Sequence, residues 1–178
     1  MDDKTLFELV RRGDENALVE LVNRYHSPLY KFLCRFTGDI HLANDLVQET
    51  FTRLLIYQGA APDQFKSWMY ALARNLARDH FRSRHYRYEQ AADFSDDTLG
   101  FDPLQFTIGE NDDVTTALAA LTADQREVIV LRFYHDLKLE EIAEITGAPV
   151  GTVKSRLFHA LKRLKGFLAV TEIPYDRQ

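Results

Sequence analysis

The sequence is poor in the residues that interrupt helices or crosslink a chain. Its 178 residues include eight glycines, five prolines and a single cysteine, Cys34. One cysteine excludes an intrachain disulfide and the ligand spacing of a structural zinc site, so we expect a reducing, cytoplasmic location and no bound metal. Cys34 stands among Phe32, Leu33 and Phe36, and we interpret it as a small core residue rather than a redox sensor.

Long apolar runs and catalytic motifs are also missing. No stretch of about 18 apolar residues occurs, and the acidic start MDDKTLFELV lacks the apolar core of a signal peptide. We therefore expect no signal peptide and no membrane insertion. The patterns GxxxxGK[ST] and GxSxG are absent, and the six histidines are scattered. These absences argue against an enzyme and against a bound cofactor.

Negative charge is unevenly distributed along the chain. The net charge is −5, but eight acidic residues fall within residues 88–113, which contain no lysine or arginine. Outside this segment 19 acidic residues balance 22 basic ones, for a net charge of +3. The segment has glycine, proline and no helical period, so we predict an acidic linker there. Its scattered apolar residues leave open whether it is disordered or docks on the rest of the chain.

The rest of the chain has the apolar period of helices. We expect helices over residues 2–12, 15–26, 29–37, 42–57, 65–84, 114–121, 123–133, 139–146 and 150–164. Asp14 and Thr122 are predicted N-caps, and Ser27-Pro28 is predicted to end one helix and start the next. The fold class is therefore all-α, with two small helical domains: an N-terminal helical bundle (residues 1–87) and a C-terminal helix-turn-helix domain (residues 114–170). The acidic linker joins them, and residues 171–178 form a tail.

The helix-turn-helix prediction is based on residues 139–164. Gly147 can take the positive φ of a tight turn, and Pro149 is tolerated at a helix start. In the second helix Val150, Val153, Leu157, Leu161 and Leu164 form one buried stripe. The opposite face carries hydroxyl and basic side chains suited to a major groove, namely Thr152, Lys154, Ser155, Arg156 and His159. The alternative is a solvated amphipathic helix packed on another helix.

A second basic surface is predicted within residues 65–84. Arg74, Arg78 and Arg82 recur every four residues on one helical face, with Asn75 beside them, and Asp79 is the single acid between residues 65 and 88. Such a row of arginines can follow a phosphate backbone, and nearby aromatic side chains can stack on an exposed base. The alternative is a solvated arginine-rich face covering a core.

Four segments together resemble a known family. They are ANDLVQETFTRLL (residues 43–55), FKSWMYALARNLARDHFRSR (65–84), LTADQREVIVLRFYHDLKLEEIAEITG (121–147) and PVGTVKSRLFHALKRL (149–164). In order and content they are similar to the extracytoplasmic-function (group IV) sigma factors of the bacterial sigma-70 superfamily. The unusual Ala60-Ala61-Pro62 in the loop before the second segment leaves the promoter preference open.

The resemblance implies roles for individual residues. Asp45, Gln48, Glu49 and Arg53 would contact the β′ subunit of core RNA polymerase. The loop from Gln58 to Lys66 would line a pocket for a flipped-out base, and the single-stranded −10 element would be held by Lys66, Arg74, Asn75, Arg78 and Arg82. The −35 duplex would be read by Thr152, Lys154, Ser155, Arg156 and His159. The linker would thread the polymerase channel. Trp68 resembles a packed family residue more than a DNA-melting wedge.

The expected function is that of an alternative sigma factor in a stress response, which binds core polymerase (β′ and β) and directs promoter recognition and melting at transcription initiation. The resemblance also implies an anti-sigma factor as partner. Two alternatives remain: a helix-turn-helix regulator that binds an operator without core polymerase, and an all-helical adaptor for an acidic protein. Two arrangements of the free protein stay open: the domains sit at variable distance, or they pack together and mask their basic helices. We expect the closed arrangement to be accessible, since the apolar residues of the linker could bridge the halves.

Overall fold

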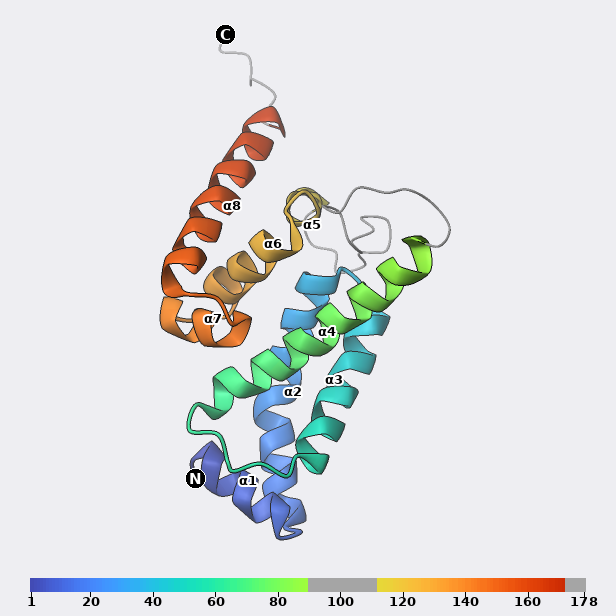
Figure 1. Cartoon of the computed structure of the whole chain (residues 1–178), viewed down its shortest axis with the longest axis vertical. Helices are drawn as coiled ribbons and strands as arrows, with labels where there is room; N and C mark the ends of the chain where they lie inside the picture. Colours follow the sequence, from blue (N-terminus) through green and yellow to red (C-terminus); the bar gives the residue numbers. More distant parts are fainter. Residues whose placement is uncertain (90–111, 172–178) are drawn as a thin grey trace.

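The computed structural model describes residues 1–89 and 112–171, and within these ranges all regular structure is helical (Figure 1). The elements are α1 (Asp3–Arg11), α2 (Glu15–Thr37), α3 (Ile40–Ile56), α4 (Phe65–Glu89), α5 (Asp112–Ala119), α6 (Ala123–Ile129), the π-helical turn η2 (Val130–Tyr134), α7 (Leu139–Thr146) and α8 (Val150–Thr171). The all-α prediction is confirmed. Most of the predicted linker and nearly all of the tail lie outside the described residues. None of the described helices could span a membrane.

The N-terminal half is a bundle of α1 to α4 around an aromatic core. Phe7, Phe32 and Phe36 are fully buried. Helix starts are fixed by aspartates: the Asp14 carboxylate accepts a hydrogen bond from the amide of Ala17 at 3.0 Å, which confirms Asp14 as the predicted N-cap of α2. Because each helix buries one apolar face, α2, α3 and α4 lie side by side (Figure 1).

Helix α2 differs from the prediction, because Ser27 and Pro28 lie inside it and do not separate two helices. Proline in a helix interior removes one hydrogen bond and crowds the carbonyl one turn earlier, at a cost of about 3 kcal/mol. Tyr25 and Leu29, on either side of the proline, are both buried in the same core. The packing of these two turns offsets the local cost, so the prediction of a break at residue 27 was wrong.

Two further core interpretations are consistent with the structure. Cys34 is 1% exposed, and burial raises the pKa of its thiol. Trp68 is partly buried and packs its ring against Tyr57, with centroids 4.9 Å apart, and against Phe65 at 5.6 Å. Both side chains therefore contribute to packing of the N-terminal bundle.

The C-terminal half contains the helix-turn-helix. Thr122 caps α6, accepting a hydrogen bond from the Gln125 amide, as predicted. Gly147 ends α7 with a φ of 70°, the left-handed conformation predicted for the turn. Helix α8 then packs Val153 and Leu157 into the core formed with α6 and α7. This packing directs the opposite face of α8 outward.

The two halves pack against one another. Helix α4 lies along α7, and the buried apolar residues of both halves form one continuous core (Figure 1). The Arg35 guanidinium of α2 lies 4.2 Å from the centroid of the Tyr134 ring, a cation–π contact between the halves. The structure thus has the closed one of the two arrangements that the sequence left open for the free protein.

A buried arginine joins the halves at the end of α2. Arg126 is 3% exposed and donates hydrogen bonds of 3.0 Å to three carbonyl oxygens, those of Phe36, Leu118 and Leu121. Burial, with a smaller contribution from nearby Arg78, lowers the pKa of Arg126 to about 10, so its guanidinium stays charged at neutral pH. A charged donor without these carbonyls would leave an uncompensated buried charge.

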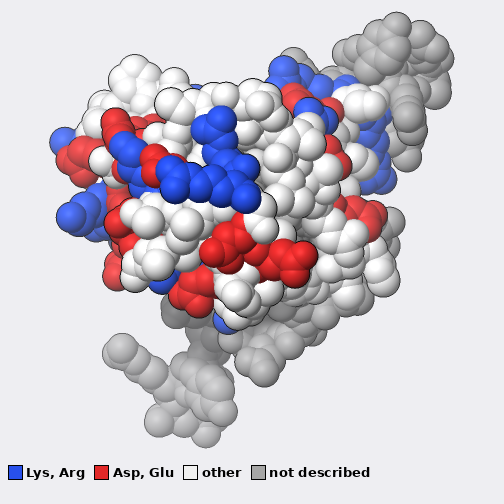
Figure 2. Space-filling view, turned by 90° about the horizontal axis from the view of Figure 1, so that it is seen from below, with Lys and Arg blue, Asp and Glu red and all other residues white. Residues whose placement is uncertain are grey.

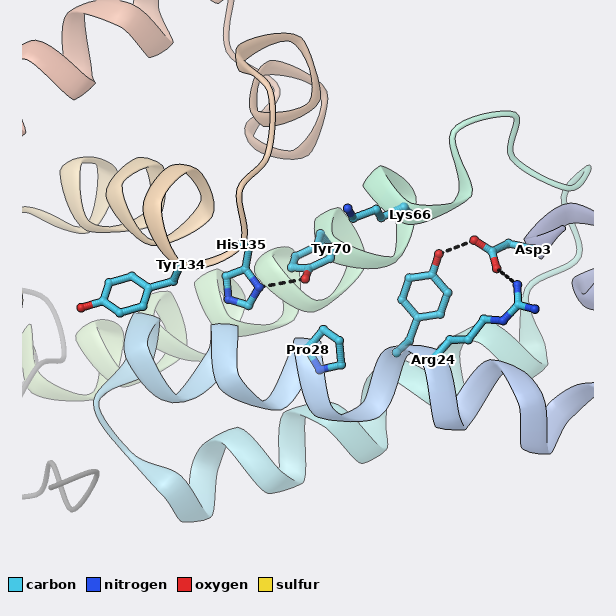
Figure 3. Close-up of a pocket in the computed structure, with 8 residues that line it drawn as sticks. Asp3, Arg24, Pro28, Lys66, Tyr70, Tyr134 and His135 are labelled. Carbon is cyan, nitrogen blue, oxygen red and sulfur yellow. Dashed lines mark hydrogen bonds and ion pairs between the residues drawn. The ribbon is translucent and has the colours of Figure 1, made fainter. Parts of the chain in front are cut away.

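A cavity of about 480 Å³ opens where α2 and α4 meet the segment after η2 (Figure 3). On its wall His135 shares a 3.0 Å hydrogen bond with the Tyr70 hydroxyl through Nδ1, while its buried Nε2 has no protein partner. Burial, followed by the positive charges of Arg35, Lys66 and Lys31, lowers the pKa of His135 to about 4. His135 is therefore neutral when the halves are packed.

The conformation at Gly147 gives a stability prediction. Gly147→Ala would place a Cβ in open space but in the left-handed region, which costs about 1–2 kcal/mol for an L-residue. We expect the midpoint of thermal unfolding to fall by several degrees. The control is Gly166→Ala in α8, where the Cβ also meets open space without a positive φ, and alanine is favoured by up to about 1 kcal/mol. Equal effects of the two substitutions would contradict this account.

The environment of His135 gives a pH prediction. Its pKa in the closed protein is about 4, below the ordinary 6.5, so the opened or unfolded protein takes up the proton first. The stability that neutral His135 contributes to the closed protein is fully present above about pH 6.5 and is lost as the pH drops towards 4. Between pH 7 and 5 the unfolding midpoint should decrease less for His135→Gln than for the wild type. His80→Gln, at an exposed position of α4, should retain the wild-type slope.

Candidate nucleic-acid interface

Helix α4 presents its arginines on one face because the other face is buried. Ala73, Ala77 and Phe81 are at most 4% exposed and anchor the helix on the bundle. Arg74, Arg78 and Arg82 are each one residue further along, so they lie together on the adjacent face. The predicted row of arginines is therefore present, but its members have different surroundings.

Arg74 and Arg78 both bind the carboxylate of Glu127, which belongs to α6 in the other half. The Nε and one terminal nitrogen of Arg74 lie 2.9 and 3.1 Å from the two Glu127 oxygens, a bidentate pair. A terminal nitrogen of Arg78 lies 3.0 Å from Glu127 Oε1. The Glu127 side chain is 0% exposed, and the two arginine side chains are 17% and 21% exposed.

Asp124, one turn before Glu127, extends this cluster to α8. Its Oδ1 accepts a 2.6 Å hydrogen bond from Arg78, and its Oδ2 lies 3.6 Å from a terminal nitrogen of Arg156. Burial alone would raise the pKa of Asp124, but the hydrogen bond and charge of Arg78 hold it below its usual value. Burial disfavours the charged form of Arg78, yet Glu127 and Asp124 raise its pKa. Asp124 and Arg78 are therefore both ionised at neutral pH.

The remaining −10 candidates are more accessible. Arg82 is 75% exposed and pairs with Asp79 at 2.8 Å within α4. Asn75 is exposed, and its Oδ1 accepts a 3.1 Å hydrogen bond from Arg74. Lys66 is exposed at the first turn of α4 and lines the cavity in Figure 3. The structure thus brings Asn75 to the arginines and places Lys66 two turns away.

The loop before α4 is attached to α1 at two points. Lys4 pairs with Asp63 at 2.7 Å, and the Arg11 guanidinium donates to the carbonyl of Gly59 at 2.9 Å. Both contacts are at the surface, where screening by solvent keeps their contribution to stability small. Together they fix the course of residues 58–66, the predicted wall of a base pocket.

The −35 candidates lie on the outward face of α8, near its start. Lys154, Ser155 and His159 are exposed, Thr152 is partly exposed, and Arg156 is partly covered by its contact with Asp124. Val153, Leu157 and Ala160 are buried on the inner face. The first two turns of α8 therefore present hydroxyl and basic groups together, an arrangement suited to phosphates and base edges.

The polymerase-docking candidates form a separate polar face on α3. Asp45, Gln48 and Arg53 are exposed, and Glu49 is partly exposed. Glu49 binds Arg53 across one helical turn at 2.7 Å. Leu55 and Ile56 continue the surface at the end of α3 with 52% and 58% exposure, unusual for large apolar side chains. A polar face beside exposed apolar residues is typical of a protein-binding surface.

Basic and acidic groups are mixed on the face of the closed protein at the α1 end. Figure 2 shows lysine and arginine side chains lying next to aspartate and glutamate on the face seen from the α1 end. On α4, Arg74 and Arg78 are largely covered by their contacts with α6, whereas Arg82 is exposed. The closed form therefore does not present the arginines of α4 as one open basic strip.

Sequence reasoning missed the acids and the arginine of α6. Asp124, Arg126 and Glu127 are not among the site residues that the sequence predicts. One signal was present: a charged pair, Arg126-Glu127, directly precedes the apolar run from Val128 to Leu131. Charged residues directly before an apolar run in the same helix are candidates for burial, and buried charges are almost always paired.

Comparison with known proteins relates both halves to one family. Residues 21–87 match the Sigma-70 region 2 family and residues 111–164 match Sigma-70, region 4. The chain is 28% identical to the ECF RNA polymerase sigma factor SigW of Bacillus subtilis over 177 residues, covering 91% of this chain and 94% of that protein. It is 31% identical to the ECF RNA polymerase sigma factor SigC of Mycobacterium tuberculosis over 159 residues, covering 84% and 82%.

Solved structures give the same relationship. The sigma factor RpoE from Bartonella quintana, crystallised with the anti-sigma factor NepR, superposes with a TM-score of 0.70 at 27% identity, covering 86% of this chain and 97% of RpoE. With two regional family matches in order and relatives above 30% identity over most of both chains, this protein belongs to the ECF family of alternative RNA polymerase sigma factors.

Proposed function

We propose that this sigma factor divides its work between three helical faces. The α3 face with Asp45, Gln48, Glu49 and Arg53 docks on the β′ subunit of core polymerase, α4 binds the −10 strand, and α8 reads the −35 duplex. Residues 1–87 and 114–170 are the corresponding functional domains, joined by residues 88–113. The observation that supports this division is that three polar faces lie on separate helices whose opposite faces are buried. The faces of α3 and α8 are exposed, and that of α4 is partly covered by α6.

At the −10 element the chain acts by binding a melted strand. Arg74, Arg78 and Arg82 hold successive phosphates, since their spacing along α4 follows one face of the helix. Lys66 closes the loop of residues 58–66, which receives the flipped base, and Asn75 lies beside Arg74 to bind the strand next to it. Extracting a base costs a few kcal/mol, which contacts to the base and to the strand offset.

At the −35 element the start of α8 enters the major groove. Arg156 and Lys154 can bind guanine edges, while Thr152, Ser155 and His159 contact phosphates or base edges. Promoter recognition then requires binding only, so the protein initiates transcription without catalytic chemistry or a cofactor of its own. It acts in the cytoplasm, where core polymerase and promoter DNA are found.

We also infer an anti-sigma factor as partner. RpoE of Bartonella quintana was crystallised with one. An inhibitor of the present chain would cover the α3 face together with the DNA-binding helices, because blocking both prevents docking and promoter binding.

The transcriptional role is tested with core bacterial RNA polymerase in pull-down and run-off assays. Arg78→Ala/Arg82→Ala should bind core polymerase like the wild type and start transcripts at least about tenfold less well, since two phosphate contacts are lost. The control Arg12→Ala/Lys31→Ala removes equal charge from two exposed positions, one directly after α1 and one in α2, and should transcribe normally. A wild type that binds duplex DNA but not core polymerase would instead support an operator-binding regulator.

The docking role of α3 is tested by a charge reversal. Glu49→Lys should weaken binding to core polymerase by about tenfold or more, because it reverses a charge and separates Arg53 from its partner at the interface. Glu20→Lys in α2 is a matched control, since Glu20 also pairs with an arginine four residues later, Arg24, at 2.9 Å. Equal binding of the two variants in a pull-down titration would rule out the α3 face as the docking surface.

A further inference from the structure

We propose that Glu127 and Asp124 form an internal phosphate mimic that holds Arg74 and Arg78 in the free protein and competes with promoter DNA for them. The proposal rests on the function proposed above for these two arginines. We call the four side chains the acidic latch. In this view the closed packing of the halves inhibits the protein by occupying its own DNA-binding groups.

The geometry of the acidic latch is that of phosphate recognition. Glu127 accepts two parallel N–H bonds from Arg74 at 2.9 and 3.1 Å and further contacts from Arg78, so both carboxylate oxygens are occupied. Planar guanidinium groups bind carboxylates and phosphates in the same bidentate manner. A DNA phosphate and Glu127 therefore cannot occupy the same face of Arg74 at once.

The acidic latch includes the first two arginines of the row on α4, and the third, Arg82, lies outside it. Arg74 and Arg78 are mostly buried under α6, whereas Arg82 is 75% exposed and pairs within its own helix. The three arginines are evenly spaced on one helical face, so α4 by itself would expose them to a similar extent. The packing of α6 onto α4 accounts for it.

Asp124 connects the acidic latch to the other DNA-reading helix. Its two oxygens contact Arg78 of α4 at 2.6 Å and Arg156 of α8 at 3.6 Å. A single carboxylate thus faces one −10 candidate and one −35 candidate. Separation of the halves would remove Asp124 and Glu127 from α4 in one event, which links exposure of the −10 surface to opening.

The energetic balance suits a reversible device. Burying an ion pair costs desolvation that its mutual attraction only roughly offsets, so the net contribution of the acidic latch to stability is small. The apolar contacts and Arg126 supply most of the attraction between the halves. A strand with many phosphates can then displace two carboxylates, especially once α3, which remains exposed in the closed form, is docked on polymerase.

The test uses the full chain without polymerase and a fluorescein-labelled, mixed-sequence single-stranded DNA of about 20 nucleotides. Asp124→Asn and Glu127→Gln each weaken the acidic latch and should bind this DNA at least about fivefold more tightly than the wild type in fluorescence anisotropy. Glu20→Gln changes the net charge equally at a surface pair in α2, away from α4, and should bind like the wild type.

Salt dependence separates a released latch from a simple change in charge. Each arginine freed for a phosphate steepens the plot of log affinity against log salt by about 0.7 for single strands. Glu127→Gln frees Arg74, whereas Arg78 keeps its 2.6 Å bond to Asp124, so it should steepen the slope by about 0.7. The double variant Asp124→Asn/Glu127→Gln frees both arginines and should steepen it by about 1.4, and the control should not change it. Thermal melting checks that the variants are folded to the same extent as the wild type. If Glu127→Gln unfolds, Asp124→Asn carries the test, because the Asp124 side chain is 48% exposed.

Folded latch variants with the affinity and salt slope of the wild type would overturn the proposal. That result is distinct from failure of the proposed function, in which Arg78→Ala/Arg82→Ala would transcribe normally with core polymerase. If transcription depends on the arginines while the latch variants bind DNA like the wild type, the packing of the halves is a resting geometry without inhibitory effect.

Discussion

The closed structure depends on a charged arginine that is surrounded by backbone carbonyls. Arg126 reaches from α6 to the last turn of α2, where the Phe36 carbonyl has no partner within its helix, and also binds the carbonyls of Leu118 and Leu121. The cation lies at the negative end of the α2 dipole, an added electrostatic gain. Because the next residue is Glu127, fixing Arg126 also fixes the carboxylate that binds α4.

This arrangement separates the surfaces of the protein by accessibility. The α3 face and the outward side of α8 remain at the surface, whereas Arg74 and Arg78 of α4 lie beneath α6. A partner that recognises the α3 face could therefore bind the closed protein, because this face is exposed there. If α4 binds a melted strand as we propose, the halves must first move apart, and docking through α3 can precede that step.

Much of the fold follows from local sequence, and the misses have a common cause. The apolar period, the caps at Asp14 and Thr122 and the glycine turn at Gly147 act within a few residues, and each was predicted. Pro28 was misread because tertiary packing outweighed a local helix breaker. The roles of Arg126 and Glu127 could not be predicted from local pattern, since burial of a charge depends on partners distant in sequence.

The environment of Cys34 limits how the protein can respond to oxidants. Thiol oxidation proceeds through the thiolate, and this sulfur is both shielded from solvent and held in its protonated form. As the chain has no other cysteine, thiol chemistry has no reactive site on the folded protein. An oxidative signal that reaches this sigma factor through thiols must therefore be received by another molecule and transmitted by binding.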